Sequence, residues 1–302
     1  MKIVFMGTPD FAVASLDALV QANFDVVAVV TAPDKPAGRG QKLNESAVKK
    51  YAVEKGIPVL QPEKLKNPEF IEELSAYQAD LQVVVAFRML PEMVWNMPPK
   101  GTINLHGSLL PQYRGAAPIN HAIINGEKES GVTTFFLKHE IDTGDTILSE
   151  STPIGDDETA GELHDKLMAI GANLIVKTLK AIEANEVQEQ PQLQSETLKH
   201  APKIFKDDCK IDWNNTSQTV HNLIRGLSPY PTAFTFLNDK TLKIFKAEIE
   251  DKESAIVAGG FLTDGKTYLK FATKDGFIKL LDIQYEGKKR MLIEDFLRGM
   301  RF

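Results

Sequence analysis

The sequence is poor in cysteine and contains no long apolar run. A single cysteine among 302 residues excludes an intrachain disulfide and a cysteine-based metal cage, so we expect a reducing cytoplasm. The apolar run before Gly7 is too short for a signal peptide, and no later run is long enough to span a bilayer. The expected protein is cytoplasmic and makes no use of a membrane.

A net positive charge is also lacking. Lys and Arg number 35 against 41 Asp and Glu, which leaves a formal charge of -6 and argues against a protein that coats nucleic acid. The average hides an asymmetry, because residues 1–202 carry 18 basic and 27 acidic groups whereas residues 203–302 carry 17 and 14. We therefore expect any polyanion to meet the net-positive C-terminal third or a local basic loop.

Short β-branched runs alternate with helical patterns over about the first 185 residues, which is typical of parallel strands joined by crossover helices. Strands are predicted over 2–6, 26–30, 81–86, 101–105, 131–137 and 147–153. A helix is predicted over 11–22, and a longer one begins at the capping box of residues 159–162. The predicted class is α/β, with a Rossmann-like, mostly parallel sheet in an N-terminal domain of residues 1–188.

A polar connection follows, in which glutamines alternate at positions 188, 190, 192 and 194. We interpret residues 189–206 as a linker. Beyond it, short strand patterns at 232–236, 243–249, 268–272 and 277–283 are separated by turn signals such as Asp264-Gly265 and Asp275-Gly276. This pattern predicts a second domain over 207–302, an OB-like β-barrel.

Two polar residues lie at the C-terminal end of the predicted strand over 101–105, one within it and one just after it. Asn104 and His106 are two positions apart, so their side chains project to the same side, at the strand end where open α/β sheets bind ligands. An amide and an imidazole side by side suit acyl chemistry, since both donate hydrogen bonds to an oxygen that becomes negative. A lone histidine at a strand end is, however, more often structural.

A second polar segment, residues 139–145, joins two predicted strands and carries three carboxylates and a glycine. A carboxylate close to His106 would fix its tautomer and raise its basicity. Taken by itself, this segment is more often an inert, solvated acidic loop.

The two segments together carry a resemblance. Asn104-x-His106-x-Ser108-Leu-Leu-Pro111, with Asp142-x-Gly144 downstream, is similar to the folate-dependent formyltransferase family. Segments 5–11, 33–40, 211–213 and 228–231 resemble the branch of that family that acts on methionyl-tRNA. The match covers nearly the whole chain.

The resemblance implies a formyl donor, 10-formyltetrahydrofolate, and a catalytic trio of Asn104, His106 and Asp142. The folate-binding residues that it implies are Phe87, Arg88, Leu90, Ser108, Leu109, Leu110 and Pro111. Segment 86–91 departs from the family pattern at Phe87-Arg88, which leaves open whether Arg88 approaches the folate or points to solvent. No metal is expected, because the six histidines are scattered and form no H-x-x-x-H pair.

The acceptor amine has to be chosen from the rest of the chain. A basic loop over 32–50 and the net-positive C-terminal domain favour initiator methionyl-tRNA, with Lys35, Arg39, Lys42 and Lys206 as candidate tRNA contacts. An N-formyltransferase acting on a sugar-nucleotide amine is the alternative, because such enzymes carry a similar second domain. A folate hydrolase that releases formate would need neither the basic loop nor the second domain.

Overall fold

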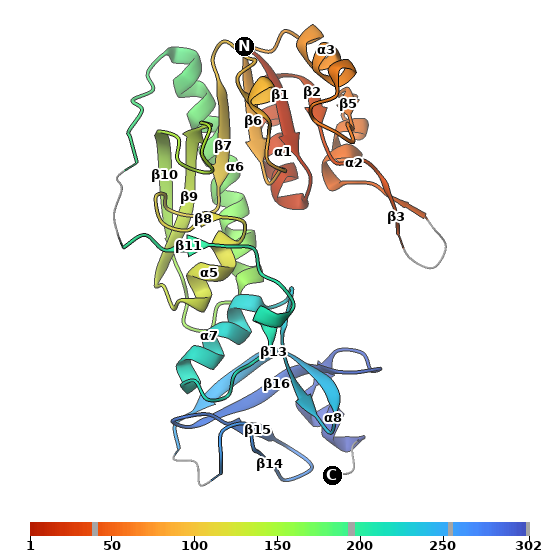
Figure 1. Cartoon of the computed structure of the whole chain (residues 1–302), viewed down its shortest axis with the longest axis vertical. Coiled ribbons are helices and arrows are strands. Elements are labelled where there is room, and N and C mark those ends of the chain that lie inside the picture. The colour runs from red at the N-terminus through yellow and green to blue at the C-terminus, as the bar shows by residue number, and fades with distance from the viewer. Residues whose placement is uncertain (38–41, 193–196, 253–255, 300–302) are drawn as a thin grey trace. The chain divides into compact units, whose positions relative to one another are not determined.

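The computed structural model describes residues 1–37, 42–192, 197–252 and 256–299 (Figure 1). It divides into two compact units, which are described separately. Unit 1 comprises residues 1–114, 131–152 and 164–199, and unit 2 comprises 115–130, 153–163 and 200–302. The limits of 1–188, 189–206 and 207–302 stay a prediction. Among the described residues, no helix has the length and apolar character that a membrane span requires.

A seven-stranded sheet forms the centre of the N-terminal half, in the order β10-β9-β7-β6-β1-β2-β5. The strands are β1 (Lys2–Gly7), β2 (Asp25–Val30), β5 (Val59–Leu60), β6 (Leu81–Val85), β7 (Thr102–His106), β9 (Glu129–Phe136) and β10 (Thr146–Pro153). Strands β5, β2, β1, β6 and β7 pair in parallel, whereas β9 runs antiparallel to β7. The predicted mostly parallel sheet is confirmed. Every residue of β6 is buried, which explains why the strand is apolar apart from Gln82.

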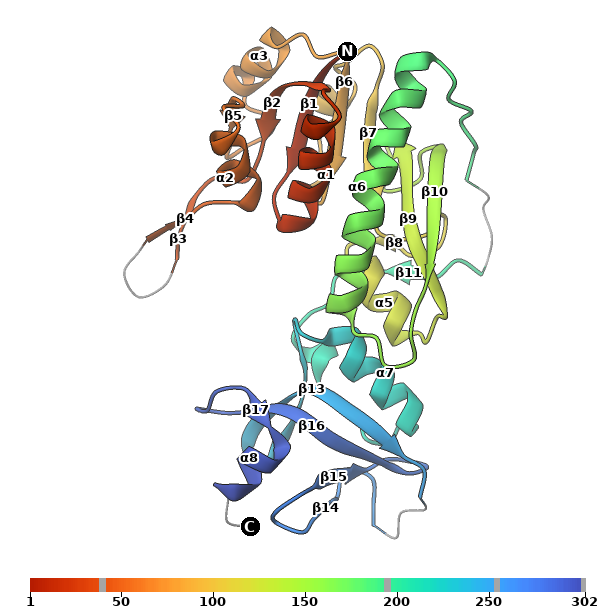
Figure 2. The same cartoon turned by 180° about the vertical axis from the view of Figure 1, so that it is seen from behind.

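Helices flank this sheet. They are α1 (Asp10–Gln21), α2 (Ala47–Glu54), α3 (Pro68–Ala76), α4 (Glu92–Trp95) and α6 (Ala160–Ala184). Figure 2 shows α1 and α6 in front of the strands. Gly171 of α6 lies so close to Leu105 of β7 that a Cβ would come within 2.8 Å of the leucine side chain, so this helix packs tightly on the central strand. The capping box is confirmed by reciprocal bonds between Thr159 and Glu162.

Unit 2 contains a curled antiparallel sheet, a half-barrel, in the order β12-β13-β16-β15-β14 with β17 beside β16. Its strands are β12 (Ala233–Leu237), β13 (Lys240–Glu250), β14 (Phe261–Thr263), β15 (Leu269–Ala272), β16 (Phe277–Tyr285) and β17 (Met291–Leu292). Helices α5 (Pro118–Ile124), α7 (Ser217–Leu227) and α8 (Ile293–Arg298) accompany it, and α7 packs on β13. Trp213 stacks on Phe271 in its core, with ring centroids 4.7 Å apart. The four predicted strands are confirmed within a few residues.

Several short elements complete the chain: β3 (Lys35–Ala37), β4 (Lys42–Asn44), β8 (Arg114–Gly115), β11 (His200–Ala201) and a single 3-10 turn at Asp207–Cys209. Strands β3 and β4 lie on either side of residues 38–41 in the sequence and pair antiparallel, so the predicted basic loop contains a β-hairpin. None of these elements has the length or periodicity that would identify it in the sequence.

Candidate active site

The carboxyl end of β7 carries the two polar residues predicted from the sequence. Asn104 pairs with Val84 of β6 on one side and with Phe135 of β9 on the other, and His106 lies opposite Thr133 of β9. Both side chains project from the same side of the strand because they are two residues apart. They lie at the edge of the parallel sheet where α/β proteins bind their ligands.

His106 is held by a main-chain carbonyl. The residue is 7% exposed, and Nε2 lies 2.9 Å from the carbonyl oxygen of Tyr113. A carbonyl oxygen can only accept, so Nε2 is the protonated nitrogen of the neutral ring. The free lone pair is then on Nδ1, which lies 3.8 Å from Oδ2 of Asp142. Any proton that His106 takes up or releases therefore passes through Nδ1, beside that carboxylate.

Steric limits at two residues fix the conformation of the loop that carries Asp142. Asp142 has a φ of 53°, in the left-handed region that few residues adopt and that Asp tolerates better than most. Two residues later, a Cβ on Gly144 would lie 1.5 Å from the carbonyl oxygen of Phe136, so only glycine fits. The side chain of Asp142 is 12% exposed. The Asp-x-Gly spacing seen in the sequence thus has a physical reason: it lets the loop press against β9 and turn the carboxylate toward His106.

The segment after His106 is tied to β9. Ser108 is buried, its hydroxyl donates to the carbonyl of Gln112, and its own carbonyl accepts from the hydroxyl of Thr133. The same threonine oxygen accepts from the main-chain N–H of Leu110. Leu109, Leu110 and Pro111 are half-buried beside it. The structure therefore places four of the predicted folate-binding residues in a fixed loop directly after the histidine, and their contact with folate stays a prediction.

The other three predicted folate-binding residues follow β6. Leu90 is buried in a core cluster that Phe87 also joins. The guanidinium of Arg88 donates to the carbonyls of Pro62 and Glu63 and lies 5.7 Å from the centre of the Phe87 ring. These bonds give Arg88 a structural role, in closing the β6 loop against residues 62–63. A folate contact for Phe87, Arg88 and Leu90 stays a prediction.

The predicted tRNA contacts occur in both units. Lys35 is exposed at the start of β3, and Lys42 begins β4. Arg39 lies outside the described residues, and Lys206 is exposed in unit 2. The pattern of basic residues over 32–50 also included Lys49, yet its ammonium pairs with Asp34 and, at 2.9 Å, with Glu45. The hydrogen bond that Lys49 donates to Asp34 is the main reason that the pKa of Lys49 is raised, so this lysine keeps its charge, which the two carboxylates balance at the base of the hairpin.

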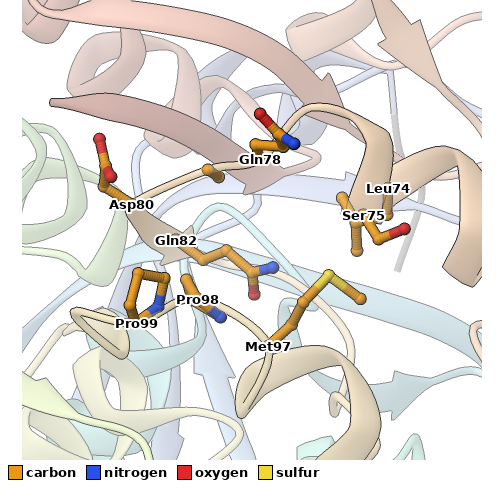
Figure 3. Close-up of a pocket in the computed structure, with 9 residues that line it drawn as sticks. Leu74, Ser75, Gln78, Asp80, Gln82, Met97, Pro98 and Pro99 are labelled. Carbon is orange, nitrogen blue, oxygen red and sulfur yellow. The ribbon is translucent and has the colours of Figure 1, made fainter.

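A cavity lies at the opposite end of the strands, where β6 and β7 begin (Figure 3). Its lining includes Leu74, Gln82, Met97 and Pro98, and the buried Gln82 accepts a hydrogen bond from Thr102. Asn104, His106 and Asp142 do not contribute to it. Within the described ranges, no group of three or more His, Cys, Asp or Glu side chains is arranged to hold a metal ion.

Sequence reasoning missed the groups that hold the pair in place. The carbonyl of Tyr113 selects the tautomer of His106, and the hydroxyl of Thr133 joins the following loop to β9. A main-chain carbonyl leaves no mark in a sequence. Tyr113 does have a positive φ of 60°, but nothing about a tyrosine predicts that conformation.

Comparisons with known proteins cover both halves of the chain. Residues 1–179 match the family described as formyl transferase, and residues 203–301 match formyl transferase, C-terminal domain. A methionyl-tRNA formyltransferase from Azobacteroides pseudotrichonymphae is 55% identical over 309 residues, which cover 99% of this chain and 95% of that protein. Another with the same name, from Parabacteroides distasonis, is 54% identical over 311 residues, 100% of this chain and 96% of its own.

Solved structures resemble this one more distantly. A sugar 3N-formyl transferase, crystallised in the presence of dTDP and 5-N-formyl-THF, has a TM-score of 0.69 at 22% identity and covers 96% of this chain and 99% of its own. An N-formyltransferase from Helicobacter canadensis, in complex with folinic acid and dTDP-3-aminofucose, has a TM-score of 0.66 at 24% identity over 93% and 98% of the two chains. At these identities the likeness shows the fold alone.

Proposed function

Because the chain belongs to the formyl transferase family, we propose that it transfers the formyl group of 10-formyltetrahydrofolate to the amino group of methionine carried by initiator tRNA. The observation that carries this proposal is the His106–Asp142 pair at the carboxyl end of β7, with Asn104 on the same side of the strand. Relatives that share more than half of their residues with this chain, over almost their full length, carry the name of that activity.

The chemistry asks two things of the site. When the amine attacks the formyl carbon, the formyl oxygen gains negative charge, and hydrogen-bond donors fixed in advance lower the barrier. The amide of Asn104 is one donor, and Nδ1–H of the protonated His106 ring is the other. Tyr113 keeps Nε2 occupied, so Nδ1 is the ring atom that remains to face the reacting oxygen.

Protons must also move, because the amine loses one and N10 of the folate gains one as the C–N bond to the donor breaks. The carboxylate of Asp142 accepts a proton from the amine directly or through a water molecule and returns it to N10 as the C–N bond to the donor breaks, and it stabilises the positive charge on His106. The carboxylate lies beside the imidazole, with 3.8 Å between Oδ2 of Asp142 and Nδ1 of His106. The proton that the amine loses and the proton that N10 gains are thus both handled beside the His106–Asp142 pair.

The acceptor is proposed on the strength of the relatives and of charge. Lys35 and Lys42 of the β3–β4 pair, with Lys206 in unit 2 and Arg39, which lies outside the described residues, are proposed to contact tRNA phosphates. Such contacts position the acceptor end without reading its sequence. A local basic hairpin reconciles a net charge of -6 with binding of a nucleic acid.

Single-turnover transfer to methionyl-tRNA tests the catalytic assignment. We expect His106→Ala and Asp142→Asn each to slow the transfer step by about 10²–10⁴-fold, the usual contribution of a general acid or base. Glu140→Gln is the matched control, because Glu140 is an exposed carboxylate in the same loop. A near-normal rate in either variant would sink the assignment, as would an equal loss in the control.

A further inference from the structure

The side chain of Gln192 joins the two loops that hold the catalytic pair. Its Nε2 donates to the carbonyl of Asp142 at 2.9 Å and to the carbonyl of Gly144 at 2.7 Å. Its Oε1 accepts two bonds from Arg114, from Nε at 3.0 Å and from an Nη at 2.6 Å. Four hydrogen bonds meet on one amide of the alternating glutamine run.

Only an amide satisfies this arrangement. Main-chain carbonyls accept and cannot donate, and a guanidinium donates and cannot accept. The side chain between them must therefore present two N–H groups on one atom and an acceptor on the other. Glutamate would keep the contact with Arg114 but would turn a carboxylate oxygen toward two carbonyl oxygens, and the loop would lose both donors.

The partners of Gln192 lead to both members of the pair. On one side the amide grips the main chain of Asp142 itself and of Gly144. On the other it holds Arg114, the residue after Tyr113, whose carbonyl fixes Nε2 of His106. The N–H of Tyr113 in turn donates to the carbonyl of Lys199, further along the same segment as Gln192. The loop that holds the imidazole and the loop that holds the carboxylate are thus both hydrogen-bonded to the polar connection, at Gln192 and at Lys199.

We infer that Gln192 is a positioning residue for formyl transfer, which sets the placement of the Asp142 carboxylate relative to Nδ1 of His106. The inference rests on the proposed function and adds a role for the polar connection that the sequence suggested was only a linker. Gln192 touches neither folate nor acceptor in this role, so its loss alters the rate of the transfer step and leaves the binding of both substrates intact. A misplacement of about 1 Å costs on the order of 100-fold in rate.

The first test separates kcat from KM. In Gln192→Glu and Gln192→Met, we expect kcat to fall about 10- to 100-fold while KM for the folate donor and for methionyl-tRNA changes less than about twofold. Gln188→Glu is the matched control, because Gln188 is an exposed member of the same glutamine run and undergoes the same change of charge. A kcat for both Gln192 variants within twofold of the control would overturn the inference.

A double-mutant cycle tests whether Gln192 acts through Asp142. In an Asp142→Ala background, Gln192→Glu should slow single-turnover transfer less than about twofold further, because the group that it places is already gone. A full additional loss in that background would show a role elsewhere and would overturn the inference. If the wild-type protein fails to formylate methionyl-tRNA, the proposed function fails and this inference with it. If the wild type is active and Gln192→Glu equals the control, the inference fails alone.

Discussion

Gly144→Ala perturbs the Asp142 loop with a single methyl group. The added Cβ would lie 1.5 Å from the carbonyl oxygen of Phe136, and real Cβ atoms come no closer than about 3.0 Å to such a neighbour. The loop must therefore retreat from β9 by about 1.5 Å. Because Nε2 of Gln192 donates to the carbonyl of Gly144 itself, the movement also pulls on that bond.

A displacement of that size exceeds the roughly 1 Å that costs about 100-fold in rate, so we expect kcat to fall by at least that factor. The assay is single-turnover formylation of methionyl-tRNA at saturating donor. Gly155→Ala serves as the control, since its Cβ would meet Glu158 at an ordinary 3.5 Å. A Gly144→Ala protein with a rate within about threefold of wild type would refute the claim that the placement of Asp142 governs the reaction.

Three further predictions concern pH and the acceptor. Burial is the main reason that the pKa of His221 is lowered. The stability that the neutral His221 ring contributes is complete above about pH 6.5 and is lost as pH falls through the lower folded pKa. The Tm of the wild type should therefore drop more than that of His221→Gln between pH 7.5 and 5.5. The N–H of Ser217 is the main cause that lowers the pKa of Asp275, so Asp275→Asn should reduce Tm at pH 7, with the difference shrinking below pH 3.8. Arg39→Ala should raise KM for methionyl-tRNA and leave KM for the folate donor unchanged in steady-state assays; equal effects would contradict a tRNA contact.

The sequence predicted the sheet well because burial leaves a direct record in it. A strand covered on both faces, such as β6, is apolar at almost every position, Gln82 being its one polar residue, and the turn at Asn238-Asp239 carries residues that tolerate the positive φ seen there. Helix α7 was missed, although Val220, Ile224 and Leu227 form an apolar face that packs into the C-terminal core. It stands in a region where every other pattern indicated strands.

The candidate site divides in the same way. Asn104 and His106 are two positions apart, and ligands bind at the carboxyl ends of strands in open α/β sheets. These two facts were enough to place both side chains on one side of the sheet, at its ligand-binding end. Their pairing with Asp142, 36 residues beyond His106, came from the resemblance and has no local signal. The main-chain carbonyl of Tyr113 and the side-chain amide of Gln192 make tertiary contacts, and no pattern of residue types along the sequence predicts them.

The most direct test offers the purified protein 10-formyltetrahydrofolate with three acceptors in parallel: initiator methionyl-tRNA, elongator methionyl-tRNA and an amino-sugar nucleotide. We expect rapid formylation of the initiator methionyl-tRNA, with kcat/KM at least about 100-fold above that for the sugar nucleotide, which corresponds to about 2.7 kcal/mol of discrimination. Preferential formylation of the amino sugar, or release of formate without transfer to any acceptor, would contradict this expectation.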